Sequence, residues 1–320
     1  MNYIGSKKRL LSFIKQSIIQ TVGDISCSIF CDMFAGSGVV GRAFKNRVKL
    51  LISNDIEYYS FVLNKNFIQN KKLINYQKYI DELNSLDLIE GFIYKNYSYS
   101  AKRYYFSDTN AKKIDAIREQ IELYKDDQQL YYFLLSSLLL SSDKVANTAS
   151  VYCSFLKKLK KSAKQDLVLK PALYELHDKD HLVFNEDANT LIKKIKGDIL
   201  YLDPPYSVRH YGANYHLLNT IALYDKFKPI GKTGLREYYH SPYSKVSLAK
   251  DTLEDLIKNA NFKYIFLSYN NEGIIDTKDI KNIMQKYGDY HILTKEYKRY
   301  QVSKNHNHTV VKEQLHILKK

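Results

Sequence analysis

The stretch Ser28–Lys45, "SIFCDMFAGSGVVGRAFK", joins a short apolar run to a glycine-rich turn and then to a helical pattern. A strand is expected over 28–31, and the three glycines allow a tight turn and close packing of the helix that follows. A second apolar run, 50–53, ends in Asn54-Asp55 before another helical pattern. The chain therefore begins with a β-α-β unit whose second strand ends at an acidic residue.

The C-terminal part of the chain repeats this alternation. Strand-like runs such as 198–206 and 264–270 alternate with helical patterns such as 249–260. The last two strand-like runs, 290–301 and 309–320, have only a short polar connection between them, which predicts an antiparallel hairpin. We therefore expect an α/β fold, with helices on both faces of a mostly parallel sheet and a C-terminal antiparallel hairpin.

A region with a different pattern separates the two α/β parts. From about 66 to 180 the sequence has long helical patterns, tyrosine-rich and lysine-rich stretches, and no sustained strand period. We expect residues 1–65 and 181–320 to form one domain, and 66–180 to be a mainly helical, basic insertion.

The composition of the chain indicates which classes of partner it can bind. The chain has 320 residues and a net charge of +15, an excess that favours a polyanion such as nucleic acid, although charge alone is weak support. No apolar run is long enough to span a bilayer, and the N-terminus lacks the pattern of a signal peptide. The three cysteines, an odd number with no C-x-x-C pair, are expected to be reduced thiols. A cytoplasmic protein without a membrane partner is the expectation.

The glycine-rich turn is the first candidate site. Ligands bind at the carboxyl ends of parallel strands, where a turn of this kind lets a ligand approach backbone N–H groups. Asp55 follows the next strand at the spacing expected of a carboxylate that accepts hydrogen bonds from a ribose. Gly36 to Gly41 also matches the dinucleotide pattern G-x-G-x-x-G, but one such match is weak. The alternative is a tight strand-to-helix turn with no ligand.

The second candidate site is the run Asp203-Pro204-Pro205-Tyr206, which follows a buried strand. Two successive prolines restrict φ and remove two backbone donors, so the loop leaves the strand in a rigid conformation. The Asp203 carboxylate and the Pro204 carbonyl could then accept hydrogen bonds from a planar exocyclic amine, and the Tyr206 ring could stack on its base. The alternative is a simple Pro-Pro turn.

Both candidate sites resemble motifs of one family. "DMFAGSG" is similar to the cofactor loop of S-adenosylmethionine-dependent methyltransferases, and "DPPY" is similar to the catalytic motif of those that methylate amino groups. The chain as a whole resembles the Dam-like class of DNA adenine-N6 methyltransferases in the alpha arrangement, which includes modification methylases of type II restriction systems. The resemblance implies a Rossmann-like methyltransferase fold, S-adenosyl-L-methionine as cofactor and double-stranded DNA as partner. The acceptor would be the N6 amino group of a flipped-out adenine.

The resemblance also implies roles for individual residues. It makes Asp203, Pro204, Pro205 and Tyr206 catalytic. The implied cofactor-binding residues are Tyr3, Gly5, Lys7, Asp32, Phe34, Ala35, Gly36, Ser37, Gly38, Asp55, Ile56, Asp187 and Ala188. The insertion would recognise the target, and the expected DNA-binding residues are Lys157, Lys158, Lys160, Lys161, Arg209, Tyr211 and Asn214. For the four lysines the alternative is a solvated helix face.

The sequence leaves other functions open. The acceptor could instead be N4 of cytosine, an RNA adenine or a protein amide, although the aspartate at 203 favours DNA adenine. A non-enzymatic DNA-binding protein on the same scaffold is a third hypothesis, opposed by the intact motifs. Methylation of cytosine C5 needs a nucleophilic cysteine after proline, and the sequence has no Pro-Cys pair. A monomer without a metal, working beside a cognate restriction endonuclease, completes the expectation.

Overall fold

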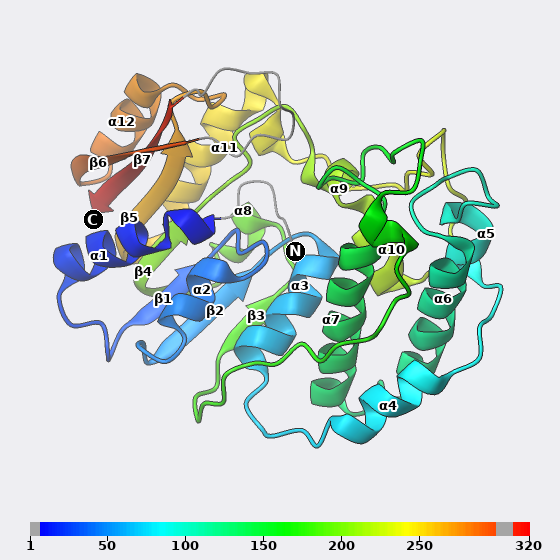
Figure 1. Ribbon diagram of the computed structural model, residues 1–320. Coiled ribbons are helices and arrows are strands. Elements are labelled where there is room, and N and C mark those ends of the chain that lie inside the picture. The colour runs from blue at the N-terminus through cyan, green and yellow to red at the C-terminus, as the bar shows by residue number, and fades with distance from the viewer. Residues whose placement is uncertain (1–6, 299–309) are drawn as a thin grey trace. The chain divides into compact units, whose positions relative to one another are not determined.

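The computed structural model describes residues 7–298 and 310–320, and they divide into two compact units (Figure 1). Within the described residues, the sheet unit comprises 7–56, 179–210 and 239–320. The helical unit comprises Glu57–Asp178 and Tyr211–Tyr238. The chain therefore leaves the sheet unit twice, once after the second strand and once shortly after the Pro-Pro loop.

Within the described residues, the sheet has seven strands in the order β3-β2-β1-β4-β5-β7-β6. Their bounds are β1 Ile29–Asp32, β2 Leu50–Asn54, β3 Leu182–Phe184, β4 Lys196–Leu202, β5 Asn261–Asn270, β6 Asp289–Lys298 and β7 Val310–Lys319. The first five strands in that order pair in parallel, whereas β7 pairs antiparallel with both β5 and β6. The predicted α/β fold with a C-terminal antiparallel hairpin is confirmed.

Helices of the sheet unit pack apolar faces on this sheet. They are α1 Leu11–Val22, α2 Val39–Phe44, α8 Ala188–Leu191, α11 Val246–Asn259 and α12 Thr277–Gln285, with 3₁₀ turns η1 Lys7–Arg9 and η4 Pro242–Ser244. In α11 the buried residues Ala249, Leu253, Leu256 and Ile257 recur at helical spacing, so one face enters the core that Ile265 and Leu267 of β5 also line. This packing holds the strands whose carboxyl ends carry the motifs.

The second unit is built from helices. They are α3 Tyr58–Asn64, a π-helical turn η2 Lys65–Gln69, α4 Gln77–Ser85, α5 Phe92–Tyr97, α6 Asp108–Glu122, α7 Gln128–Val145, η3 Lys161–Lys164, α9 Tyr211–Asn214 and α10 His216–Leu223. α7 is buried on nearly all sides, as expected of a helix at the centre of its unit. The predicted helical character of 66–180 agrees with these elements.

The bounds of the helical unit differ from the expected 66–180. It begins at Glu57 and takes in Tyr211–Tyr238, a segment that we expected in the catalytic domain. The reason is the apolar face of α10, on which Leu217, Leu218 and Ile221 are fully buried in the core of the helical unit. Burial of that face decides which unit the segment joins.

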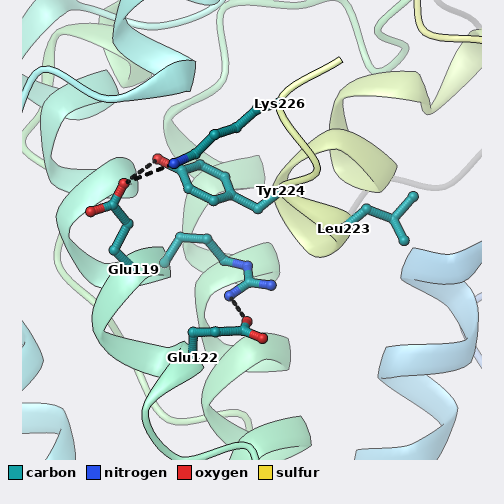
Figure 2. Close-up of a pocket in the computed structure, with 6 residues that line it drawn as sticks. Glu119, Glu122, Leu223, Tyr224 and Lys226 are labelled. Atoms are coloured by element: carbon teal, nitrogen blue, oxygen red, sulfur yellow. Dashed lines mark hydrogen bonds and ion pairs between the residues drawn. The ribbon is translucent and has the colours of Figure 1, made fainter.

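Arg118 of α6 joins that helix to the end of α10. Its guanidinium donates to the backbone oxygens of Ile221 (3.0 Å) and Ala222 (3.1 Å), which satisfies carbonyls of the last helical turn. It also pairs with Glu122 at 2.7 Å. An open depression of about 310 Å³ lies beside this junction, lined by Arg118, Glu119, Glu122, Leu223, Tyr224 and Lys226 (Figure 2). Because its charged groups pair with one another, we assign the depression to the helix junction.

No helix in the described parts of the chain has the length and apolar character needed to cross a membrane.

Candidate active site

Three acidic residues lie at one edge of the sheet. Asp32 ends β1, Asp55 follows β2, and Asp203 follows β4. The parallel register pairs Asp32 with Ser53 on one side and with Tyr201 on the other. The carboxyl ends of these strands therefore meet at the same level, where open α/β sheets bind their ligands.

The glycine-rich turn is fixed by the first two of these carboxylates. The backbone N–H of Gly36 donates to Asp55 Oδ2 at 2.7 Å, and that of Gly41 donates to Asp32 Oδ2 at 2.9 Å. Gly36 and Gly38 have φ values of 51° and 73°, a left-handed conformation that favours glycine. The turn is thus preorganised, with Ala35 and Ser37 half-buried beside the glycines.

Asp32 has an unusual environment. Its side chain is only 1% exposed, and among the described residues Oδ1 has no hydrogen-bond partner. Burial raises the pKa of Asp32 to about 7, despite the hydrogen bond from Gly41. A buried oxygen that lacks a partner at a strand end is available for a hydrogen bond with a group that binds there.

Asn54 is a structural residue of this edge that the sequence interpretation missed. Its side-chain amide donates to the backbone oxygens of Met33 (3.2 Å) and Glu186 (3.0 Å), and its Oδ1 accepts from the Glu186 N–H at 3.0 Å. It therefore ties together the loops that follow β1, β2 and β3. The available signal was an amide residue at the end of a buried strand, where both its donor and its acceptor need partners.

The loop after β3 carries two more predicted cofactor residues. Asp187 caps α8 by accepting from the Thr190 N–H at 2.9 Å, and its second oxygen accepts from the Tyr239 hydroxyl at 2.8 Å. Ala188 is buried behind it. Asn185 links this loop to the first site, because its amide donates to the backbone oxygens of Asp55 (2.7 Å) and Ile56 (2.9 Å). Tyr239 was not predicted.

Asp203 is held by a buried lysine. Lys7 Nζ lies 2.9 Å from Asp203 Oδ1 and 2.9 Å from Glu313 Oε1, and only 5% of the Lys7 side chain is exposed. Burial alone lowers the pKa of Lys7, but the two carboxylates raise it more, so the ammonium stays charged. For Asp203, burial raises the pKa to about 6 against the opposing attraction of Lys7. Lys7 is thus an ion-pair partner of the predicted catalytic aspartate.

Tyr206 completes the loop. Its ring centroid lies 5.4 Å from Lys7 Nζ and 5.9 Å from the ring of Tyr269, which it meets edge to face. Its backbone oxygen accepts from the N–H of Ile274 at 3.1 Å. Pro204 is buried and Pro205 half-buried. The ring is therefore held in place on two sides while remaining partly exposed, as a stacking surface must be.

Of the remaining predicted cofactor residues, Phe34 is described by the structure, whereas Tyr3 and Gly5 are not. Phe34 packs edge to face on Tyr243, with ring centroids 5.2 Å apart. The Tyr243 hydroxyl in turn donates to Asn189 at 2.6 Å. Tyr3 and Gly5 lie outside the described residues.

The predicted DNA-binding residues fall in both units. Lys157, Lys158 and Lys161 are exposed, but Lys160 donates from Nζ to the backbone oxygen of Thr148 at 2.8 Å. Lys157, Lys158 and Lys160 lie in a loop, so the alternative of a solvated helix face does not apply to them. Only Lys161 begins a short 3₁₀ turn.

The three residues after the catalytic loop differ in exposure. Arg209 of the sheet unit is exposed. In the helical unit, Tyr211 stacks on Tyr215 with centroids 6.2 Å apart, and Asn214 is 8% exposed. The backbone oxygen of Asn214 accepts from the Tyr152 N–H at 2.7 Å, so this residue helps to anchor the loop 146–160, the lysine-rich loop.

Comparison with known proteins gives consistent matches. The model of the family described as "D12 class N6 adenine-specific DNA methyltransferase" matches residues 3–283. The type II methyltransferase M.NlaIII of Neisseria lactamica is 51% identical over 332 residues, across 100% of this chain and 99% of that protein. Modification methylase StsI of Streptococcus sanguinis is 38% identical, across 95% of this chain and 50% of that protein. Type II methyltransferase M.FokI of Planomicrobium okeanokoites is 36% identical, with coverages of 94% and 50%. The chain therefore spans nearly all of the first relative and about half the length of the other two.

Proposed function

Because the chain belongs to the D12 class of N6 adenine-specific DNA methyltransferases, we propose that the acidic edge of the sheet is where the adenine is methylated. The observation that carries this proposal is the placement of Asp203 at the end of β4, beside the β1 strand that leads into the glycine-rich turn. The turn and the Pro-Pro loop thus start from adjacent strands, as a cofactor site and an acceptor site must do if a methyl group is to pass between them.

We propose S-adenosyl-L-methionine as the cofactor. The residues fit it, because the buried Asp32 Oδ1 lacks a partner among the described residues and the left-handed Gly36 and Gly38 add no side chain at two positions of the turn. Asp55 and Ile56 would bind the ribose, and Asp187 with Ala188 would bind the adenine of the cofactor. When bound, this cofactor supplies an electrophilic methyl group on a sulfonium.

The acceptor amine would be oriented by this chain's own groups. The Asp203 carboxylate and the Pro204 carbonyl accept hydrogen bonds from N6–H, which favours rehybridisation of the nitrogen and aims its lone pair. Lys7 stabilises Asp203 as a carboxylate by its ion pair of 2.9 Å. The Tyr206 ring stacks on the flipped base, which must leave the duplex to reach this site. The proposal requires neither a covalent nucleophile nor a metal.

A labelled-methyl assay tests the function and the role of Asp203 together. Purified protein is incubated with methyl-labelled cofactor and duplex DNA, and the DNA is then digested to nucleosides. Label in N6-methyladenine is expected, whereas label in N4-methylcytosine, or none in DNA, would refute the proposal. Asp203→Ala should lower the rate by about a hundredfold or more, the scale of losing one transition-state hydrogen-bond partner. Asp251→Ala, an exposed carboxylate of α11, is the matched control and should keep the wild-type rate.

We propose further that the enzyme works in the cytoplasm as a monomer, and that it protects host DNA from a cognate endonuclease. The names of the relatives support the link to a restriction system, since M.NlaIII and M.FokI are called type II methyltransferases. Plasmid DNA from cells expressing the chain should carry N6-methyladenine at one short sequence and resist the endonuclease that cuts there. Methylation scattered over many unrelated sequences would contradict the proposal.

The helical unit is proposed to read the target sequence. Lys157, Lys158 and Lys161 are exposed and could contact phosphates. Their loop is anchored by Asn147, whose amide donates to the backbone oxygens of Tyr104 (2.8 Å) and Leu156 (2.9 Å). An anchored loop loses less conformational entropy on binding than a mobile one.

A further inference from the structure

The buried cluster around Lys7 contains one more carboxylate than the ammonium can neutralise. Lys7 Nζ lies at equal distances of 2.9 Å from Asp203 and from Glu313. Glu313 is 2% exposed and its Oε1 also accepts a hydrogen bond from the Ser268 hydroxyl at 2.5 Å. A buried, unneutralised charge is costly, so a second carboxylate in this position requires an explanation.

The strands explain how Glu313 reaches the cluster. Asp203 directly follows β4, Ser268 lies on β5 and Glu313 lies on β7. Leu202 is paired with Leu267 in the register, and Asn270 with Glu313. Ser268 thus lies between the other two, and Lys7 bridges the strands on either side of β5. Lys7 is therefore held by Asp203 on one side and by Glu313 on the other, and the Ser268 hydroxyl fixes the rotamer of Glu313.

We propose that Glu313 is a positioning residue for methyl transfer, which holds the Lys7 ammonium so that Asp203 presents its carboxylate to the acceptor amine. This inference rests on the proposed role of Asp203. Glu313 itself does not touch the substrate. It acts through Lys7 in two ways, by fixing the place of the ammonium and by sharing its charge with Asp203.

The shared charge has a measurable consequence. The titratable groups that act on Asp203 and Lys7 are Glu313 of β7, Tyr201 of β4, Asp32 of β1 and Tyr206 of the loop. Burial has the largest effect and raises the pKa of Asp203. The charge of Lys7 lowers this pKa, and the charge of Glu313 raises it. Without the charge of Glu313, the Lys7 ammonium pairs with Asp203 alone. The pKa of Asp203 should then fall, so Asp203 should release its proton at lower pH.

The test is the pH profile of the single-turnover rate of methyl transfer, with enzyme in excess over duplex DNA and cofactor saturating. Glu313→Gln keeps the shape of the side chain and removes its charge. We expect the acidic limb of the profile to move down by about one pH unit, the lower end of what a neighbouring charge does to a carboxyl. We also expect the plateau rate to fall by about tenfold, because Lys7 is no longer held from the β7 side.

Two further variants separate charge from position. Glu313→Asp keeps the charge but places it farther from Lys7. The acidic limb of its pH profile should therefore move down by less than in Glu313→Gln, and its plateau rate should lie between those of the wild type and Glu313→Gln. Glu296→Gln, which removes a charge from the exposed pair of Glu296 with Lys312 in the same hairpin, should leave the profile unchanged. This control shows whether any negative charge of the hairpin has the effect.

A purely structural Glu313 would lower the midpoint of thermal unfolding and leave the acidic limb at its wild-type pH. That result for Glu313→Gln would overturn the inference. If the Gln variant does not fold, the inference is overturned by a Glu313→Asp variant whose acidic limb and plateau rate equal those of the wild type. The proposed function is tested separately by the wild-type protein. Wild-type methylation of adenine with an unmoved limb in the variants refutes only the role of Glu313.

Discussion

The backbone N–H of Gly36 donates to Asp55 Oδ2 at 2.7 Å, so the turn after β1 is joined to the carboxylate that follows β2. This hydrogen bond joins one oxygen of Asp55 to the turn in which Gly36 and Gly38 are left-handed, and the Asp55 side chain is half-buried. The same residue therefore helps to shape the glycine-rich turn and is proposed to bind the ribose of the cofactor beside it.

Substitution of Asp55 should accordingly weaken cofactor binding. Asp55→Ala removes a charged acceptor, and hydrogen bonds to charged groups contribute about 1.5–3 kcal/mol, so the Kd should rise by about 10- to 100-fold. Calorimetric titration with S-adenosyl-L-methionine measures this directly. Asp289→Ala, which removes an exposed carboxylate at the start of β6, should bind as the wild type does. Unchanged affinity in Asp55→Ala would contradict the proposed ribose contact.

Asp32 should make stability depend on pH. Burial raises the pKa of Asp32 to about 7, whereas the unfolded chain releases the same proton near 3.8, the usual pKa of an aspartate. Between these two values the folded state binds a proton that the unfolded state does not, so the free energy of unfolding falls as pH rises. Across this window Asp32 should lower the free energy of unfolding by about 4 kcal/mol, from about 3 pKa units at about 1.4 kcal/mol each.

Asp32→Asn tests this dependence. His216 and His316, whose pKa values burial lowers to about 4, work in the opposite direction, so the useful quantity is the difference between variant and wild type. Urea unfolding at several pH values between 4.5 and 7.5 should show that the variant gains stability relative to the wild type as pH rises. Parallel curves across this window would mean that Asp32 does not hold a proton.

The lysine-rich loop should contribute to DNA affinity in a salt-dependent way. Each phosphate contact adds about 0.9 to the slope of log affinity against log salt, so Lys157→Ala with Lys158→Ala should reduce the slope by about 1.8. Fluorescence anisotropy of labelled duplex DNA at several salt concentrations measures it. The double variant Lys278→Ala, Lys281→Ala removes two exposed lysines of α12 and serves as the control. Equal slopes in the two double variants would exclude a specific role for the loop.

Arg118 should be important for the stability of the helical unit. Arg118→Met leaves the carbonyls of Ile221 and Ala222 without their donor, and each buried polar group that loses its partner costs about 1–3 kcal/mol. We expect a loss of about 2–4 kcal/mol in urea unfolding. Arg47→Met, at an exposed arginine, should change stability by less than about 0.5 kcal/mol. A small effect of Arg118→Met would show that other groups cap α10.

The motifs of the sheet could be predicted from the sequence because each depends on local chemistry. A glycine turn, a Pro-Pro loop and alternating apolar runs specify strand ends whatever lies elsewhere in the chain. Glu313 could not be assigned in this way, because its partners Lys7 and Asp203 are distant in sequence. Its only local signal is its alternation with Leu315 and Ile317, which places a carboxylate on the same face as buried apolar residues.

The bounds of the units were harder to predict for a related reason. The pattern of α10 predicts a helix but does not say which core receives its apolar face. Nothing local distinguishes burial against the sheet from burial among α3 and α7, so the segment Tyr211–Tyr238 was placed by chain order. Tertiary packing decided otherwise.

The return of the chain into the helical unit has a consequence for any exchange of this unit among relatives. An exchange of 66–180 alone would combine an acquired helical core with the α10 of the host, whose buried Leu217, Leu218 and Ile221 are fitted to other neighbours. The two segments Glu57–Asp178 and Tyr211–Tyr238 must be exchanged together for the transplanted helical unit to be well packed. Recombination at a single pair of breakpoints is therefore expected to yield unstable hybrids.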